Sequence, residues 1–277
     1  NPTRQSFVIE MVGAPQLRNA VSLNSTMMNL SRILGPALAG ILITAVGLAP
    51  CFFINGLSYG AVVLMLLAMR SAELLPVAVA GRGRGQIADG FRYVYHTPAL
   101  RDILVIAAII GTLTYEFQVS LPLLAQYTFH GGAAGYAALT SALGVGAVIG
   151  GVVTAGRKST SFQTMVLAAA LFGTAALAAS LMPSLTLAIL AVVVLGFCSI
   201  FYSSTGNTTL QLSSDPQMRG RVMALWAVAM LGSTTVGGPA IGWIGEHVDP
   251  RWALATGGLA ALVAAAYGLT ALRRRLT

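Results

Sequence analysis

Apolar runs of membrane-crossing length alternate with short polar segments along all 277 residues of the chain. A helix needs roughly 20 apolar residues to cross a bilayer. Residues 159–214 hold no charged residue, so this stretch is long enough for two crossings, with a turn at Met182-Pro183-Ser184. The pattern predicts an all-α, polytopic integral membrane protein. Its eight spans are expected at about 19–46, 51–69, 102–127, 133–156, 162–182, 185–212, 222–245 and 252–272.

One part of this pattern occurs twice. The segment Pro15-Gln16-Leu17-Arg18 returns about 200 positions later as Pro216-Gln217-Met218-Arg219. Each copy opens an apolar run with a Gly-Pro pair, at Gly35-Pro36 and at Gly238-Pro239. A helix pair repeated at this distance indicates a duplicated bundle, and duplicated membrane bundles are most often transporters with a site between their halves. We therefore expect a duplicated twelve-helix (6+6) transporter fold, with four further spans upstream of these eight.

A linker separates the two parts of the chain, between residues 70 and 101. It contains Gly81-Arg82-Gly83-Arg84-Gly85 and then a helical pattern in which Ile87, Phe91, Val94 and Tyr95 share one face. This pattern is typical of a short helix in the headgroup plane, and a solvated linker is the alternative. We expect a remnant of the N-terminal bundle with two spans at 1–75, a cytoplasmic linker with an amphipathic helix at 76–100, and a C-terminal six-helix bundle at 101–277.

Composition and charge narrow the class of protein. The chain is 56% hydrophobic and 9% charged, whereas soluble domains have about 25% charged residues. The net charge of +8 does not indicate nucleic acid, because the basic residues lie between apolar runs, mainly on alternate connections. We expect a multi-pass protein of the cell (inner or plasma) membrane, with both ends of this chain cytoplasmic. Cys51 and Cys198 are isolated, and neither a cofactor nor a metal is expected.

Glu116 is the one carboxylate deep within a predicted span, about 14 residues past Asp102 and so roughly 21 Å along the helix. An ionised carboxylate at that depth is costly, so it must be protonated, paired or exposed to water. Glu116 is therefore a candidate for proton coupling. Tyr115 and Gln118 flank it, and Pro122 is expected to bend the helix nearby. The alternative is a neutral structural glutamate that is hydrogen-bonded to a neighbour.

The second half of the span 185–212 is both aromatic and polar, unlike a lipid-facing helix. We expect it to line an aqueous cavity or a seam between helices. The candidates for a substrate cavity are Tyr115, Gln118, Phe201, Tyr202, Ser204, Thr205 and Asn207. The alternative is that these polar residues serve only as hydrogen-bond partners between helices.

Three further places are candidates for interface or gating roles. Arg32 lies inside a predicted span and stays charged, so it needs a structural partner or an anionic substrate. Gly35 and Pro36 interrupt the helix and allow close approach, as a seam that moves or as simple close packing. Asp215, Arg219 and Arg221 lie in a tight cytoplasmic turn, and membrane anchoring of the arginines is the alternative there.

At these residues the chain resembles the major facilitator superfamily, in the branch of enterobactin-exporter-like and multidrug-type transporters. The resemblance covers the whole chain, aligned to helices five to twelve of a twelve-helix fold. It implies that the Gly35-Pro36 segment is the antiporter motif of helix five, although Ser31 stands where a glycine is common. It also implies that the helix with Phe201 to Asn207 lines the cavity. The segments that carry the resemblance are 4–8, 17–21, 29–40, 90–94 and 219–223.

These observations predict a secondary active transporter, not an enzyme. It would export small amphipathic molecules, drug-like or siderophore-like, by alternating access and proton antiport. Its partners would be a small-molecule substrate, protons, the lipid bilayer and the remaining N-terminal helices of the same protein, with no nucleic acid. The alternatives are an importer of the same fold, a membrane-embedded scaffold or receptor, and a membrane enzyme. The enzyme is disfavoured because Glu116 and Arg32 are the ionisable residues at depth.

Overall fold

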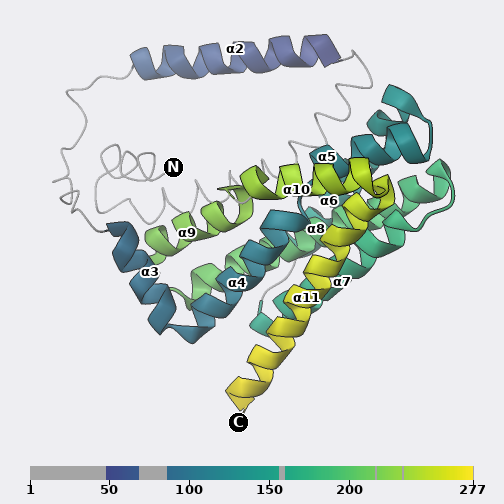
Figure 1. Ribbon diagram of the computed structural model, residues 1–277. Coiled ribbons are helices and arrows are strands. Elements are labelled where there is room, and N and C mark those ends of the chain that lie inside the picture. Colours follow the sequence, from purple (N-terminus) through teal and green to yellow (C-terminus); the bar gives the residue numbers. More distant parts are fainter. Residues whose placement is uncertain (1–47, 69–85, 156–159, 216, 233, 277) are drawn as a thin grey trace. The chain divides into compact units, whose positions relative to one another are not determined.

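The structure is a computed structural model that describes residues 48–68, 86–155, 160–215, 217–232 and 234–276 (Figure 1). All regular elements in these residues are helices, as predicted. The chain divides into two compact units, residues 1–84 and 85–277. In the first unit, α2 (Leu48–Leu67) holds an apolar segment long enough to cross a membrane. The predicted span 19–46 lies outside the described residues.

The second unit begins with the short helix α3 (Gln86–His96), and six membrane-length segments follow. Four segments are single helices: α6 (Gly132–Ala155), α7 (Phe162–Ser180), α8 (Leu185–Ser213) and α11 (Pro250–Leu276). The other two are interrupted. One consists of α4 (Pro98–Leu113), α5 (Phe117–Leu123) and the π-helical turn η2 (Leu124–Thr128). The other consists of α9 (Arg219–Ala227), the π-helical turn η3 (Val228–Gly232) and α10 (Thr234–His247). Seven of the eight predicted spans are thus present in the described part of the chain.

Helices α6 and α8 pack with their backbones in contact. Gly146 of α6 lies against the carbonyl oxygen of Val193, and a Cβ added at Gly150 would lie 2.6 Å from the carbonyl oxygen of Phe197. Gly196 of α8 faces the backbone of α6 in the same way. Small residues let the two backbones approach closely. In a bilayer the hydrophobic effect does not drive helices together, so this close van der Waals packing holds them instead. The GxxxG pair of α6 is therefore part of a tight helix seam.

The outward side chains of the bundle are apolar as well. Val152 of α6, Leu190 and Val194 of α8, and Val263 of α11 are 55%, 62%, 55% and 62% exposed. A water-soluble protein rarely exposes so continuous an apolar surface. These side chains suit the hydrocarbon of a bilayer, and the described unit is a bundle of a multi-pass membrane protein.

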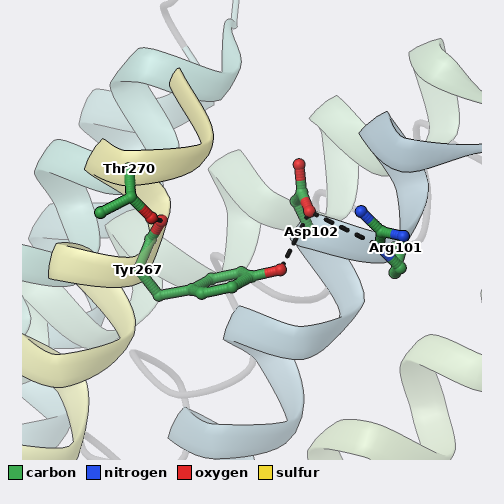
Figure 2. Close-up of polar contacts among 4 residues, drawn as sticks. All are labelled: Arg101, Asp102, Tyr267 and Thr270. Carbon is green, nitrogen blue, oxygen red and sulfur yellow. Dashed lines mark hydrogen bonds and ion pairs between the residues drawn. The ribbon is translucent and has the colours of Figure 1, made fainter. Parts of the chain in front are cut away.

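A polar contact ties the start of α4 to α11. The hydroxyl of Tyr267 donates a hydrogen bond of 3.0 Å to Oδ1 of Asp102, and Nε of Arg101 lies 3.8 Å from the same oxygen (Figure 2). The hydroxyl of Thr270 donates to the backbone carbonyl of Tyr267 at 2.7 Å. Asp102 is buried, and these contacts supply the partners that a buried carboxylate requires.

Candidate proton-coupling and substrate site

The span that carries Glu116 is broken near its middle. Helix α4 ends at Leu113 and α5 begins at Phe117, so the residues between them lie outside regular helix. Soon after Pro122 the helix widens into η2. The sequence predicted a bend near Pro122 and did not reveal the break before it. Discontinuous helices in transporters place irregular backbone at mid-membrane depth and commonly mark the binding site.

Polar side chains near the break donate hydrogen bonds to backbone carbonyl groups. The hydroxyl of Thr114 donates a 2.8 Å hydrogen bond to the carbonyl of Gly257 on α11. The carbonyl of Glu116 accepts hydrogen bonds from the backbone N–H of Ser120, at 2.9 Å, and from the hydroxyl of Ser120, at 3.0 Å. These contacts matter because an unpaired backbone group costs several kcal/mol in hydrocarbon.

Glycines bring neighbouring backbones into contact with the broken segment. Gly237 of α10 lies against the carbonyl oxygen of Thr112, so a Cβ there has no room. A Cβ added at Gly257 of α11 would lie 2.8 Å from the carbonyl oxygen of Leu113. Gly111 of α4 faces the backbone of η3 in the same way. The end of α4 is therefore enclosed by backbone on three sides, and this packing accompanies the break.

Glu116 is buried at this break, with 7% of its surface exposed. Its carboxyl group lies against the glycine pair of α10. A Cβ added at Gly237 would be 3.0 Å from Oε1, and one at Gly238 would be 3.4 Å from Oε2. Within the described residues, Oε1 has no hydrogen-bond partner and Glu116 has no ion pair. The second copy of the repeated Gly-Pro pair, Gly238-Pro239, thus begins beside a buried carboxyl group that has no ion pair among the described residues.

Tyr115, the residue before Glu116, contacts α7 and α8, whereas the Glu116 carboxyl group faces α10. Its hydroxyl donates a 2.6 Å hydrogen bond to the backbone carbonyl of Ser199 on α8. The centroid of its ring lies 5.2 Å from that of Phe172, and Phe172 stacks on Tyr202 at 6.1 Å. The structure therefore brings two predicted cavity residues, Tyr115 and Tyr202, against one shared partner, Phe172.

Three of the predicted cavity residues on α8 are buried inside the bundle. Tyr202 and Thr205 are 0% exposed, and their hydroxyl oxygens lack hydrogen-bond partners in the described part of the chain. Buried polar groups of this kind are uncommon, and each calls for an explanation such as a functional role. Phe201 points elsewhere, because its ring stacks on Phe197 of the same helix at 5.9 Å.

The remaining predicted cavity residues lie at more open positions. Gln118 on α5 is exposed, and Ser204 and Asn207 on α8 are half-buried. Oδ1 of Asn207 accepts a 2.6 Å hydrogen bond from Nε2 of Gln211, one helical turn later. These side chains are accessible to a molecule outside the bundle core, whereas Tyr202 and Thr205 are not.

The predicted gating residues are only partly within the described chain. Arg32, Gly35 and Pro36 lie outside it. Asp215 and Arg219 are exposed around the connection between α8 and α9. Nη1 of Arg221 lies 3.7 Å from Oδ2 of Asp89 on α3, so its ion pair is with the linker helix.

Sequence reasoning missed several residues of this site. Thr114, Phe172, Ser199 and Gly257 resemble many other residues in these apolar runs, and nothing in their spacing indicated the site. Gly237 precedes the repeated Gly-Pro pair directly, so the repeat itself was a usable signal. In the described residues, no three His, Cys, Asp or Glu side chains gather as a metal site requires.

Comparisons with known proteins agree with this architecture. A family model described as Transmembrane secretion effector matches residues 1–276. The enterobactin exporter EntS of Salmonella choleraesuis (strain SC-B67) is 25% identical over 245 residues, which are 87% of this chain and 58% of that protein. EntS of Escherichia coli O1:K1 / APEC is 25% identical over 265 residues, with coverages of 91% and 61%. The chain therefore spans about three fifths of the length of these curated relatives.

Two solved structures share the fold. One is a bacterial homologue of the human lysosomal transporter Spinster in an inward-facing and occupied conformation. It has a TM-score of 0.61 and 16% identity, and the match covers 98% of this chain and 73% of that one. The inward-facing and unoccupied conformation gives a TM-score of 0.59 and 18% identity, over 98% and 74%. At this identity the likeness concerns the fold alone. The chain belongs to the Transmembrane secretion effector family, which is part of the major facilitator superfamily of transporters.

Proposed function

We propose that this chain is the C-terminal part of a proton-driven exporter of small amphipathic molecules, and that Glu116 binds and releases the coupling proton. Membership in a family of membrane transporters supports the general activity. The observation that carries the coupling role is the carboxyl group of Glu116, which is buried at a broken span and whose Oε1 has no hydrogen-bond partner in the described part of the chain. Because the relatives above are named enterobactin exporters, enterobactin is one candidate substrate. A lipophilic, drug-like cation is the other.

The surroundings of Glu116 suggest how protonation would follow the transport cycle. With α10 packed over the carboxyl group, the neutral, protonated form is favoured, because an isolated charge is costly away from water. Movement of α10 away from the break would admit water and allow the carboxyl group to ionise. A group that holds its proton in one state and releases it in the other couples proton entry to substrate exit.

The seam between α10 and the broken span is suited to such movement. At Gly237 the backbones of α10 and α4 are in contact, and the side chain at this contact is that of Glu116. Pro239 removes a backbone donor inside α10 and so weakens the helix at this point. We propose that this seam opens and closes during alternating access, and that the polar positions Gln118, Ser204 and Asn207 contact substrate from the open side.

We place the protein in the inner membrane. The distribution of charge supports an orientation in which both ends of this chain lie in the cytoplasm. The contacts Asp89–Arg221 and Asp102–Tyr267 place the starts of α4 and α9 and the end of α11 at one end of the bundle. Basic residues gather at these positions.

We further propose that residues 1–75 belong to an N-terminal bundle completed by other helices of the same protein, and that 76–100 link it to the bundle at 101–277.

The coupling role can be tested in proteoliposomes that contain the full-length protein and an imposed pH gradient. Transport of enterobactin and of ethidium would be followed. Glu116→Gln keeps the shape and hydrogen-bonding capacity of the side chain but cannot titrate. It should lose gradient-driven transport and retain substrate exchange without a gradient. Glu246→Gln is the matched control, because Glu246 is exposed near the end of α10, and it should transport normally.

Each other outcome has a defined meaning. Full pH-driven transport by Glu116→Gln would show that this residue is a structural polar group. Accumulation in the opposite direction would identify an importer. Binding of either compound without movement across the membrane, in the unaltered protein, would favour a receptor or scaffold.

A further inference from the structure

Helix α3 packs on the bundle with only part of its apolar surface. Val94 is 7% exposed, and a Cβ added at the buried Gly90 would lie 3.3 Å from Cβ of Arg221. The hydroxyl of Tyr93 accepts a 3.1 Å hydrogen bond from the backbone N–H of Asp215. Together with the ion pair of Asp89 and Arg221, these contacts fix α3 against the start of α9 and determine which of its faces points outward.

Phe91 and Tyr95 point away from this contact and are 58% and 70% exposed. They are four residues apart and are therefore neighbours on one face of the helix. The sequence placed them on a single apolar face with Val94. In the structure that face is wider than the bundle contact, so Val94 is covered and the two aromatic residues are not. We call Phe91 and Tyr95, with Arg92 beside them, the aromatic face of α3.

The connection to α4 places this face at the boundary of the membrane. One residue, Thr97, separates α3 from α4, and a membrane-length segment starts at Pro98. Figure 1 shows that α3 turns sharply away from α4 at this end of the bundle. A helix that leaves a span so abruptly lies close to the headgroup region, where amphipathic helices and aromatic side chains are favoured.

The charges around α3 and the start of α9 are basic on balance, because Arg92, Arg219 and Arg221 outnumber the carboxylates of Asp89 and Asp215. Asp89 is paired with Arg221, which leaves the exposed Arg92 and Arg219 against the exposed Asp215. Arginine pairs well with phosphate, and anionic lipids attract basic segments at a membrane surface.

We propose that the aromatic face of α3 binds the headgroup region of anionic phospholipid, with both rings in the interface and the guanidinium group of Arg92 at a lipid phosphate. This contact goes beyond transport itself and does not depend on the role of Glu116. Because α3 is also fixed to the connection between α8 and α9, the lipid would hold that connection at the membrane surface.

The test places a fluorophore on α3 in the whole chain and measures quenching by lipids with brominated acyl chains. Tyr95→Cys would be labelled with an environment-sensitive dye in a background with Cys51→Ala and Cys198→Ala. Phe91→Cys is an independent second probe. The control is Gly220→Cys, because Gly220 is exposed at the start of α9 and a Cβ there meets no atom within 4 Å. The vesicles are phosphatidylcholine with or without brominated phosphatidylglycerol, compared with brominated phosphatidylcholine.

Quenching at positions 91 and 95 should be about twofold or more above that at position 220, with brominated phosphatidylglycerol the stronger quencher. Adding Arg92→Glu should reduce the preference for phosphatidylglycerol by about fivefold. Quenching at positions 91 and 95 that is no stronger than at position 220 would overturn the proposal, because the aromatic face would then be no closer to the acyl chains than the control. Equal quenching by the two lipids, unchanged by Arg92→Glu, would overturn the assignment to anionic lipid.

Discussion

The close contact between α10 and the broken span predicts that one added methyl group lowers the free energy of unfolding. Gly237→Ala would bring a Cβ against the carbonyl oxygen of Thr112 and to 3.0 Å from Oε1 of Glu116. Since the carbonyl belongs to the main chain of a closely packed segment, one of the two helices must shift. Overpacking of this kind costs about 1–3 kcal/mol.

Gly242→Ala in the same helix is the matched control. A Cβ at Gly242 would lie 3.6 Å from Cγ1 of Val119, which is an ordinary van der Waals distance. Both variants gain helix propensity of about 1 kcal/mol at most. The difference between them therefore isolates the overpacking at Gly237.

The reactivity of Cys198 provides the assay. Cys198 is buried in α8, so a thiol reagent reaches it when the bundle opens. In a Cys51→Ala background, labelling would be followed in detergent with increasing denaturant. Gly237→Ala should unfold with a free energy about 1–3 kcal/mol below that of Gly242→Ala. Equal unfolding free energies would refute the close contact between α10 and the break.

Two other predictions concern the ends of the bundle. Gly220 and Ala133 are both exposed and should lie on opposite sides of the membrane. An impermeant thiol reagent outside intact cells should therefore label the single cysteine of Ala133→Cys and not that of Gly220→Cys. The reverse pattern would show the opposite orientation. Tyr267→Phe removes the donor to buried Asp102 and should lower the unfolding free energy by about 1–3 kcal/mol. In a double-mutant cycle, Asp102→Asn and Tyr267→Phe should show a coupling of about 0.5 kcal/mol or more, and additive effects would argue against that hydrogen bond.

The number and placement of the described spans followed from the apolar pattern, because the bilayer imposes both length and composition on a helix. The break at Thr114 to Glu116 did not follow. Those residues contain neither proline nor glycine, and the helix ends where glycines of α10 and α11 bring other backbones against it. Local sequence cannot show a contact made by residues more than a hundred positions away.

The candidate site could be predicted only in part, because some of its residues are marked by their type and others only by tertiary packing. Glu116 could be identified because a carboxylate in an apolar run is rare and costly. Phe172 could not, since it becomes relevant only through packing, whereas the repeated Gly-Pro pair offered a signal for the adjoining Gly237. Helix α3 gives a similar contrast. Its amphipathic pattern was evident, but the division between Val94 and the exposed Phe91 depends on where α9 lies.

Proton release on substrate binding tests the central role of Glu116 most directly. Purified full-length protein in weakly buffered detergent would receive enterobactin or ethidium, with a pH-indicator dye as the reporter. If one site binds either substrate or proton, the unaltered protein should release about one proton per substrate bound. Glu116→Gln should bind the same substrate and release none beyond what the ligand itself contributes. Equal proton release by the two proteins would contradict the assignment of the coupling proton to Glu116.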